Sequence, residues 1–153
     1  MVSKVSLLLV FARFSSITLA IMAMKVWSSD DSSQGLNISS LGYSILALFF
    51  NITFSSTLAA GQLGSMFRGV PMPMPGDLFL SGSVMLTDWF LTCITFGTGF
   101  ASLFVTLYVM DSHFVNSSVC LTYMLHSIFC CLSGAFAGLV LLCESWIAFQ
   151  IAH

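Results

Sequence analysis

Four long apolar segments, separated by short polar stretches, make up most of this chain. They cover about residues 5–27, 41–66, 84–110 and 119–147. A helix needs roughly 20 apolar residues to cross the hydrocarbon core of a bilayer, and each segment reaches that length. The stretches between them are rich in turn formers, including the three alternating prolines of FRGVPMPMPGD, which cannot continue a helix. The pattern predicts an all-α membrane protein with a single domain over residues 1–153, folded as a four-transmembrane-helix bundle with short loops.

The first apolar segment begins close to the N-terminus, where secretory signal peptides also lie. Arg13 interrupts its apolar core, and no A-x-A cleavage site precedes Lys25. We therefore expect this segment to be a membrane span.

The composition agrees with this pattern and excludes several classes of protein. Of the 153 residues, 58% are hydrophobic and 7% are charged, whereas soluble domains carry about 25% charged residues. A water-soluble globule and a disordered chain are therefore excluded. The four Lys and Arg residues cannot form the basic surface that binds phosphates, so nucleic acid is not an expected partner.

The basic residues orient the predicted bundle in the membrane. Lys4 and Arg68 fall on the side of the two termini, whereas Lys25 falls on the other side. Cytoplasmic loops carry the excess of Lys and Arg, so we expect both termini to be cytoplasmic, by a margin of one residue. Asn37 and Asn116 belong to N-x-S/T sequons on the predicted outer side. Both lie within a few residues of a span, which restricts their access to glycosylation.

Each predicted span carries one stripe of small or polar residues at steps of three, four or seven, which places the stripe on one helix face. The stripes are Ser6, Arg13, Ser16 and Ala20; Ser44, Asn51, Ser55, Ala59 and Gln62; Asp88, Thr92, Thr95, Gly99, Ser102 and Thr106; and His126, Cys130, Ser133, Ala137 and Glu144. Small residues let helices approach closely in lipid. We expect three small-xxx-small pairs to add to this packing: Ala60/Gly64, Gly97/Ala101 and Gly134/Gly138. The stripes predict a packed bundle, and the alternative is that they line a polar conduit.

Three charged residues, Arg13, Asp88 and Glu144, lie within the predicted spans. A charge at the centre of a span costs roughly 2.5–3.5 kcal/mol on insertion scales. All three fall in the same leaflet, and the depths of Arg13 and Asp88 differ by roughly 5 Å at the rise of an α-helix. We predict an intramembrane ion pair between Arg13 and Asp88; the alternative is that each side chain reaches the interface separately. We expect no second carboxyl group beside Asp88 or Glu144 that would permit acid–base chemistry.

The remaining polar residues of the spans indicate no reaction. Asn51 lies inside the second span, so its sequon is not an expected acceptor, and His126 is expected to form a hydrogen-bonded contact between helices, with a proton relay as the alternative. The five cysteines form no C-x-x-C pair, and Cys120 is either a buried thiol or a partner in an intermolecular disulfide. Metal-ligand spacings and glycine-rich phosphate loops do not occur in the sequence. We therefore expect no catalytic residue, metal or cofactor, and the sequence identifies no small-molecule substrate.

Several stretches resemble the CASP-like family of plant proteins, relatives of the Casparian strip membrane domain proteins and similar to the MARVEL four-span group. The stretch TDWFLTCITFGTGFASL, residues 87–103, resembles the family's third span, where an Asp precedes a run of small residues. Arg13 followed by FSSITLAIMAM is similar to the family's first span. HFVNSSVC, residues 113–120, resembles an outer loop of one branch, with Cys120 at the place of a family cysteine.

The resemblance implies a multi-pass protein of the plasma membrane, whose expected partners are the lipid bilayer and related four-span proteins. Such proteins are non-enzymatic scaffolds that form homo- or hetero-oligomers with related four-span proteins, organise a membrane patch and recruit partners. By this resemblance, Arg13 and Asp88 of this chain would serve folding and assembly. The first outer loop, SSDDSSQGLNISS, lacks the aromatic-rich signature of the strip-forming members, so assembly of a lignin strip is not implied.

Other function classes remain as alternatives or fit less well. The leading alternative is a small transporter, channel or channel accessory subunit that uses the intramembrane polar stripes. The cysteine placement disfavours a membrane redox enzyme. A tetraspanin would need a large second outer loop where this chain has DSHFVNSS, and a claudin would need paired cysteines in the first outer loop, where this chain has none.

Overall fold

The structure of the protein is a computed structural model that describes residues 4–28, 39–68, 78–111 and 117–152. These residues form four α-helices: α1 (Lys4–Ser28), α2 (Ser39–Arg68), α3 (Leu78–Asp111) and α4 (Ser117–Ala152). Each helix is long and apolar enough to cross a membrane, so the predicted all-α, multi-pass architecture is confirmed. The sequon residues Asn37 and Asn116 lie outside the described residues.

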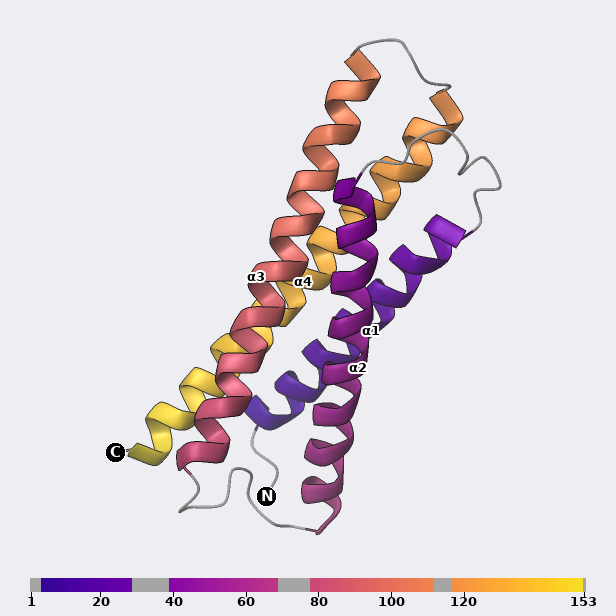
Figure 1. The fold of residues 1–153 in the computed structure, drawn as a ribbon. Helices are drawn as coiled ribbons and strands as arrows, with labels where there is room; N and C mark the ends of the chain where they lie inside the picture. The colour runs from indigo at the N-terminus through magenta and orange to yellow at the C-terminus, as the bar shows by residue number, and fades with distance from the viewer. Residues whose placement is uncertain (1–3, 29–38, 69–77, 112–116, 153) are drawn as a thin grey trace.

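The four helices form an elongated antiparallel bundle (Figure 1). α4 has the largest interfaces, with α1 and with α3, and α2 completes the bundle by packing against α1 and α3. The start of α1 and the end of α4 lie at the same end of the bundle, as an even number of spans requires. The cytoplasmic orientation of this end stays a prediction from the basic residues.

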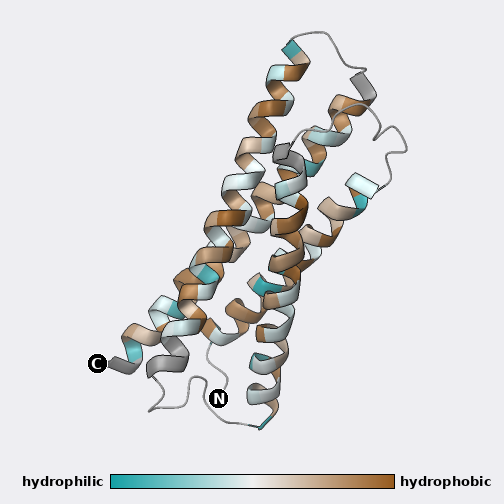
Figure 2. Cartoon of the chain, in the orientation of Figure 1, coloured by the Kyte–Doolittle hydropathy of each residue, from teal (hydrophilic) through white to brown (hydrophobic). Residues whose placement is uncertain are grey.

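Large apolar side chains cover the outside of the bundle, which is the reverse of a soluble protein. Figure 2 shows hydrophobic residues along all four helices. Phe11, Phe104 and Leu142 are 63%, 66% and 68% exposed. This arrangement suits a bilayer, because lipid tails are as apolar as these side chains. Exposed hydroxyl groups bond to the carbonyl of the preceding turn instead of to water, as Thr18 does with Phe14 at 2.8 Å.

Glycines set the distance between α3 and α4. A Cβ atom on Gly99 would lie 2.9 Å from the backbone nitrogen of Cys131, and one on Gly134 would lie 2.9 Å from the backbone of Phe96. Cβ atoms do not approach other atoms this closely, so the two helices pack at this distance because both residues lack a side chain. The predicted pair Gly134/Gly138 therefore lies in a helix interface.

The other two small-residue pairs face away from the bundle interior. Gly64 and Gly97 have open space where a Cβ atom would lie, and Ala60 and Ala101 are exposed. The expectation that these pairs add to the internal packing was wrong. Each helix turns one face inward, and the inward faces of α2 and α3 are the ones that carry the polar stripes.

Candidate functional site

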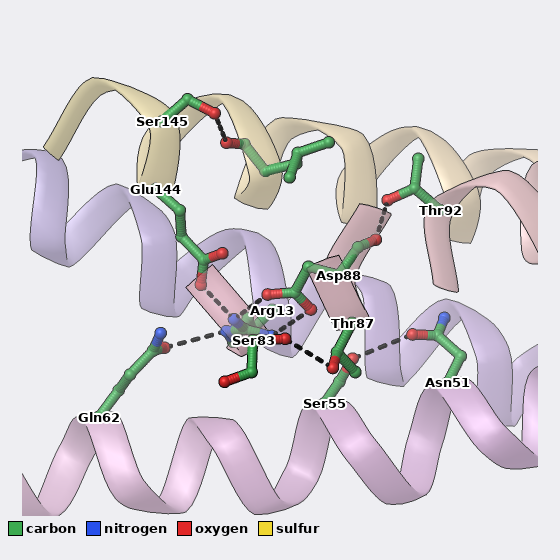
Figure 3. A network of polar contacts seen from close by, with 11 residues as sticks. Arg13, Asn51, Ser55, Gln62, Ser83, Thr87, Asp88, Thr92, Glu144 and Ser145 are labelled. Atoms are coloured by element: carbon green, nitrogen blue, oxygen red, sulfur yellow. Dashed lines mark hydrogen bonds and ion pairs between the residues drawn. The ribbon is translucent and has the colours of Figure 1, made fainter. Parts of the chain in front are cut away.

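The three charged residues within the spans, Arg13, Asp88 and Glu144, meet in one buried cluster, to which every helix contributes a side chain (Figure 3). Arg13 of α1 is 1% exposed. Its Nη1 donates to Oδ1 of Asp88 on α3 at 3.0 Å, and its Nη2 donates both to Oδ2 of Asp88 and to Oε1 of Glu144 on α4. Its Nε donates to Oε1 of Gln62 on α2 at 3.0 Å. One guanidinium group therefore links all four helices.

The chain direction and the shape of arginine explain why these residues meet. Asp88 lies early in α3 and Glu144 lies late in α4, and because α3 and α4 are antiparallel, both fall toward the end of the bundle that holds the chain termini. Arg13 lies in the first half of α1, and its long side chain reaches both carboxylates. A guanidinium group presents its N–H donors in a plane that matches the two oxygens of a carboxylate, and Asp88 accepts from it in this bidentate way.

The charges of this cluster do not balance. One guanidinium group faces two carboxylates, whose side chains are only 5% (Asp88) and 9% (Glu144) exposed. Both oxygens of Asp88 accept a hydrogen bond, whereas Oε2 of Glu144 is buried and has no hydrogen-bond partner among the described residues. An ionised oxygen left unpaired in a low-dielectric interior costs several kcal/mol. Glu144 is therefore the least satisfied member of the cluster.

A second layer, made of uncharged polar side chains, lies nearer the middle of the bundle. The hydroxyl groups of Ser16 and Ser133 each donate to the backbone carbonyl of the other residue, at 3.0 and 2.9 Å. Asn51 donates from Nδ2 to Oγ of Ser16 at 3.2 Å and to Oγ of Ser133 at 3.0 Å, and it accepts at Oδ1 from Ser55 at 2.9 Å. All four side chains are buried, so this layer joins α1, α2 and α4 through hydrogen bonds that water does not reach.

His126 forms a third layer toward the opposite end of the bundle. Its Nδ1 lies 2.9 Å from the carbonyl oxygen of Ala23, and its Nε2 lies 2.8 Å from Oγ of Ser44. Because a carbonyl oxygen only accepts, the hydrogen-bond network assigns the hydrogen of the neutral ring to Nδ1, which leaves Nε2 to accept from the Ser44 hydroxyl. The ring is fully buried, and the Trp27 ring centroid lies 5.6 Å away. Both nitrogens of His126 are therefore engaged in contacts between helices.

The structure brings together Arg13 and Asp88, the pair expected from the sequence, and adds Gln62 and Glu144 to it. The expectation that no second carboxyl group lies beside Asp88 or Glu144 was wrong, since both carboxylates contact the same Nη2 of Arg13. Two signals pointed toward Glu144: it continues the polar stripe of its span, and it shares a leaflet with Arg13. Neither signal shows which helices are neighbours, and so the contact itself was missed.

The cysteines take no part in these layers beyond one weak contact. All five are free thiols, and Cys120 is buried at the start of α4, which matches the buried-thiol alternative. This contact joins Sγ of Cys130 to Nε2 of His126 at 3.6 Å.

Searches with this chain against family models, curated proteins and solved structures found no match. The resemblance to the CASP-like family therefore rests on the sequence stretches quoted above.

Proposed function

We propose that this protein is a non-enzymatic scaffold of the plasma membrane, which associates with copies of itself or with related four-span proteins to organise a membrane patch and recruit partners. One observation carries the proposal: polar and apolar side chains are separated. The polar side chains of the three layers bond to one another inside the bundle, and large apolar side chains cover its outside. Hydrogen bonds inside such a bundle hold the helices in place, so the bundle presents an apolar surface of fixed shape to neighbouring membrane proteins.

The outer face of α3 supports association between helices. Cys93, Gly97 and Ala101 are exposed at steps of four, and Gly97 has open space beside it. The rings of Phe96 and Phe100 stand beside this row, with their centroids 5.0 Å apart. Membrane helices associate by van der Waals packing, for which small residues permit close approach. The combination of small and aromatic side chains on one exposed face is consistent with a protein that binds other helices.

The resemblance to the CASP-like family supports the same proposal. Arg13 and Asp88 stand at positions where the family has an Arg and an Asp, and in this bundle they hold all four helices together with Gln62 and Glu144. We assign the cluster a role in folding, through which the outer surface keeps its shape.

The alternative is a small transporter, channel or channel accessory subunit, because buried polar residues also line solute pathways. A pathway along the polar stripes would have to open the bonds that close each layer. These include the reciprocal pair of Ser16 and Ser133 and the bidentate pair of Arg13 and Asp88. The closed layers therefore favour the scaffold.

Extraction of the full chain from its native membrane into polymer-bounded lipid discs tests the proposal, since discs retain lipid and bound proteins. Native mass spectrometry should find dimers or larger assemblies, either of this chain alone or with another four-span protein. Two single-cysteine variants probe the contact face by oxidation with copper phenanthroline, which partitions into the bilayer and joins neighbouring thiols in a disulfide. The variant that keeps only Cys93, which is exposed on α3, should cross-link between copies if this face is in contact. The variant that keeps only the fully buried Cys130 is the matched control and should not.

Discs that contain only the monomer, with no partner, would contradict the scaffold. Flux of a solute or an ion through the purified protein in liposomes would support the transporter instead. Assemblies that form without cross-linking through Cys93 would keep the scaffold and would show that another face makes the contact.

A further inference from the structure

We propose that the cluster of Arg13, Asp88 and Glu144 is a proton-binding site, in which one proton resides on Oε2 of Glu144 in the folded bundle. The proposal goes beyond the scaffold function and does not depend on it. It rests on the charge count of the cluster and on the unequal surroundings of the two carboxylates.

The hydrogen bonds of Arg13 distinguish the two carboxylates. Asp88 accepts at both of its oxygens, from Nη1 and Nη2, whereas Glu144 accepts at Oε1 only, from Nη2. The Nε hydrogen is taken by Gln62. A single positive charge therefore serves two negative ones, and the pairing leaves Oε2 of Glu144 without a hydrogen-bond partner among the described residues. We therefore assign the proton that balances the cluster to Oε2 of Glu144.

Among the residues that the structure describes, the groups around Glu144 supply no second cation. Facing it are Arg13 from α1 and Asp88 from α3, with the uncharged Gln62 from α2 on the same guanidinium group, and its neighbour in α4 is Cys143. Lys4 and Arg68, the other described Lys and Arg residues at this end of the bundle, are exposed.

The size of the site selects a proton over other cations. Oε2 of Glu144 has less than 1 Å² of accessible surface, so a larger species could reach it only if the helices repacked. A hard metal ion such as Ca²⁺ or Mg²⁺ needs six or more oxygen ligands including water, and the described residues contain no group of three or more His, Cys, Asp and Glu side chains that could hold one. A proton needs no additional space and requires only the carboxylate oxygen itself.

Binding converts the carboxylate of Glu144 into a neutral carboxylic acid. The proton passes from a hydronium ion to a lone pair of Oε2, an O–H bond forms there, and water is released. Arg13 and Asp88 then balance each other, and Glu144 still accepts from Nη2 through Oε1. A neutral acid in this position costs far less than an ionised oxygen without a partner. The folded bundle therefore holds a proton that an unfolded chain releases at neutral pH.

The sequence makes this site directly observable, because Glu144 is its only glutamate. Full-length protein made by cell-free synthesis with glutamate labelled with ¹³C at the side-chain carboxyl carries one labelled carboxyl group. In lipid discs at neutral pH, ¹³C NMR and the infrared carbonyl stretch should show a protonated acid. After unfolding in denaturing detergent, the same signals should become those of a carboxylate. A carboxylate signal from the folded wild-type protein at neutral pH would overturn the proposal.

Asp88→Asn tests whether charge balance holds the proton. With the aspartate charge removed, Arg13 and Glu144 balance each other, so the labelled group should become a carboxylate at neutral pH. Thr98→Val is the matched control on α3, since it removes a hydroxyl that bonds to its own helix, and it should leave the acid signal unchanged. A folded Asp88→Asn protein that kept the acid signal would overturn the role of the cluster.

Glu144→Gln keeps the test decisive if Asp88→Asn does not fold. The amide resembles the protonated acid in shape and charge, so this variant should fold. Because the folded wild type binds one more proton than the unfolded chain, its stability should fall as pH rises through neutrality, and the variant should lose this slope. Equal slopes in the two proteins would also overturn the proposal.

Discussion

Replacing Arg13 by Met tests how much the charged cluster contributes to the stability of the bundle. Met has a similar length and fills much of the same space, but it removes the three hydrogen bonds to Asp88 and Glu144 and the one to Gln62. Two carboxylates would then share a buried site without a cation. They would have to take up protons or draw in water, and the contact that joins all four helices would be lost.

The size of the effect follows from the burial of the cluster. A hydrogen bond to a charged group contributes about 1.5–3 kcal/mol, but these bonds share one guanidinium group and are not additive. Removing one partner of a buried ion pair costs about 3–5 kcal/mol. The reference state acts in the same direction, since separated wild-type helices leave Arg13 facing lipid and Met lacks that penalty. We therefore expect Arg13→Met to lower the free energy of unfolding by about 3–5 kcal/mol.

Unfolding by sodium dodecyl sulfate in mixed micelles, followed by circular dichroism, measures this difference. Phe14→Leu is the matched control, because Phe14 is the next residue and is 46% exposed on the lipid-facing side; it should shift the free energy of unfolding by less than about 0.5 kcal/mol. The triple variant Arg13→Met, Asp88→Leu, Glu144→Met removes the two buried carboxylates as well and should recover part of the loss, since only the reference-state contribution stays lost. A loss below about 1 kcal/mol for Arg13→Met, or a triple variant no more stable than the single one, would refute this reasoning.

Two further predictions concern the packing of α3 against α4 and the layer of His126. Gly134→Ala places a Cβ atom 2.9 Å from the backbone of α3 and should destabilise the bundle by about 1–3 kcal/mol in the same detergent titration. Gly97→Ala, beside open space, should leave stability unchanged or slightly raised, and equal effects of the two changes would contradict the packing described here. His126→Ala removes two hydrogen bonds between helices and leaves a cavity, so we expect a loss of about 1–3 kcal/mol. Leu121→Ala on the exposed face of α4 is its control, and a His126→Ala protein as stable as that control would count against a structural role for the ring.

The sequence alone determined the element types, their approximate bounds and the inward face of each helix. Four apolar segments of membrane-spanning length predict four helices because a backbone in lipid must satisfy its hydrogen bonds within the helix. The polar stripes predicted the inward faces well, since Arg13, Asn51, Asp88 and His126 are all buried. Helical periodicity is a local property, and so the order of residues is sufficient to reveal it. Depth along the span is local too, which is why Arg13 and Asp88 could be matched before their helices were known to pack.

Only the tertiary structure decided which stripes face one another and how closely. Gln62 and Glu144 join Arg13 because of the neighbours and tilt of α2 and α4, which no spacing along one helix contains. Gly134 shows the same limit: the polar stripe indicates its helix face, but only the packing of α3 against α4 brings its Cβ position to 2.9 Å from the backbone of Phe96. Small rotations of a helix about its axis decide such contacts, and those rotations are set by the packing of all four helices together.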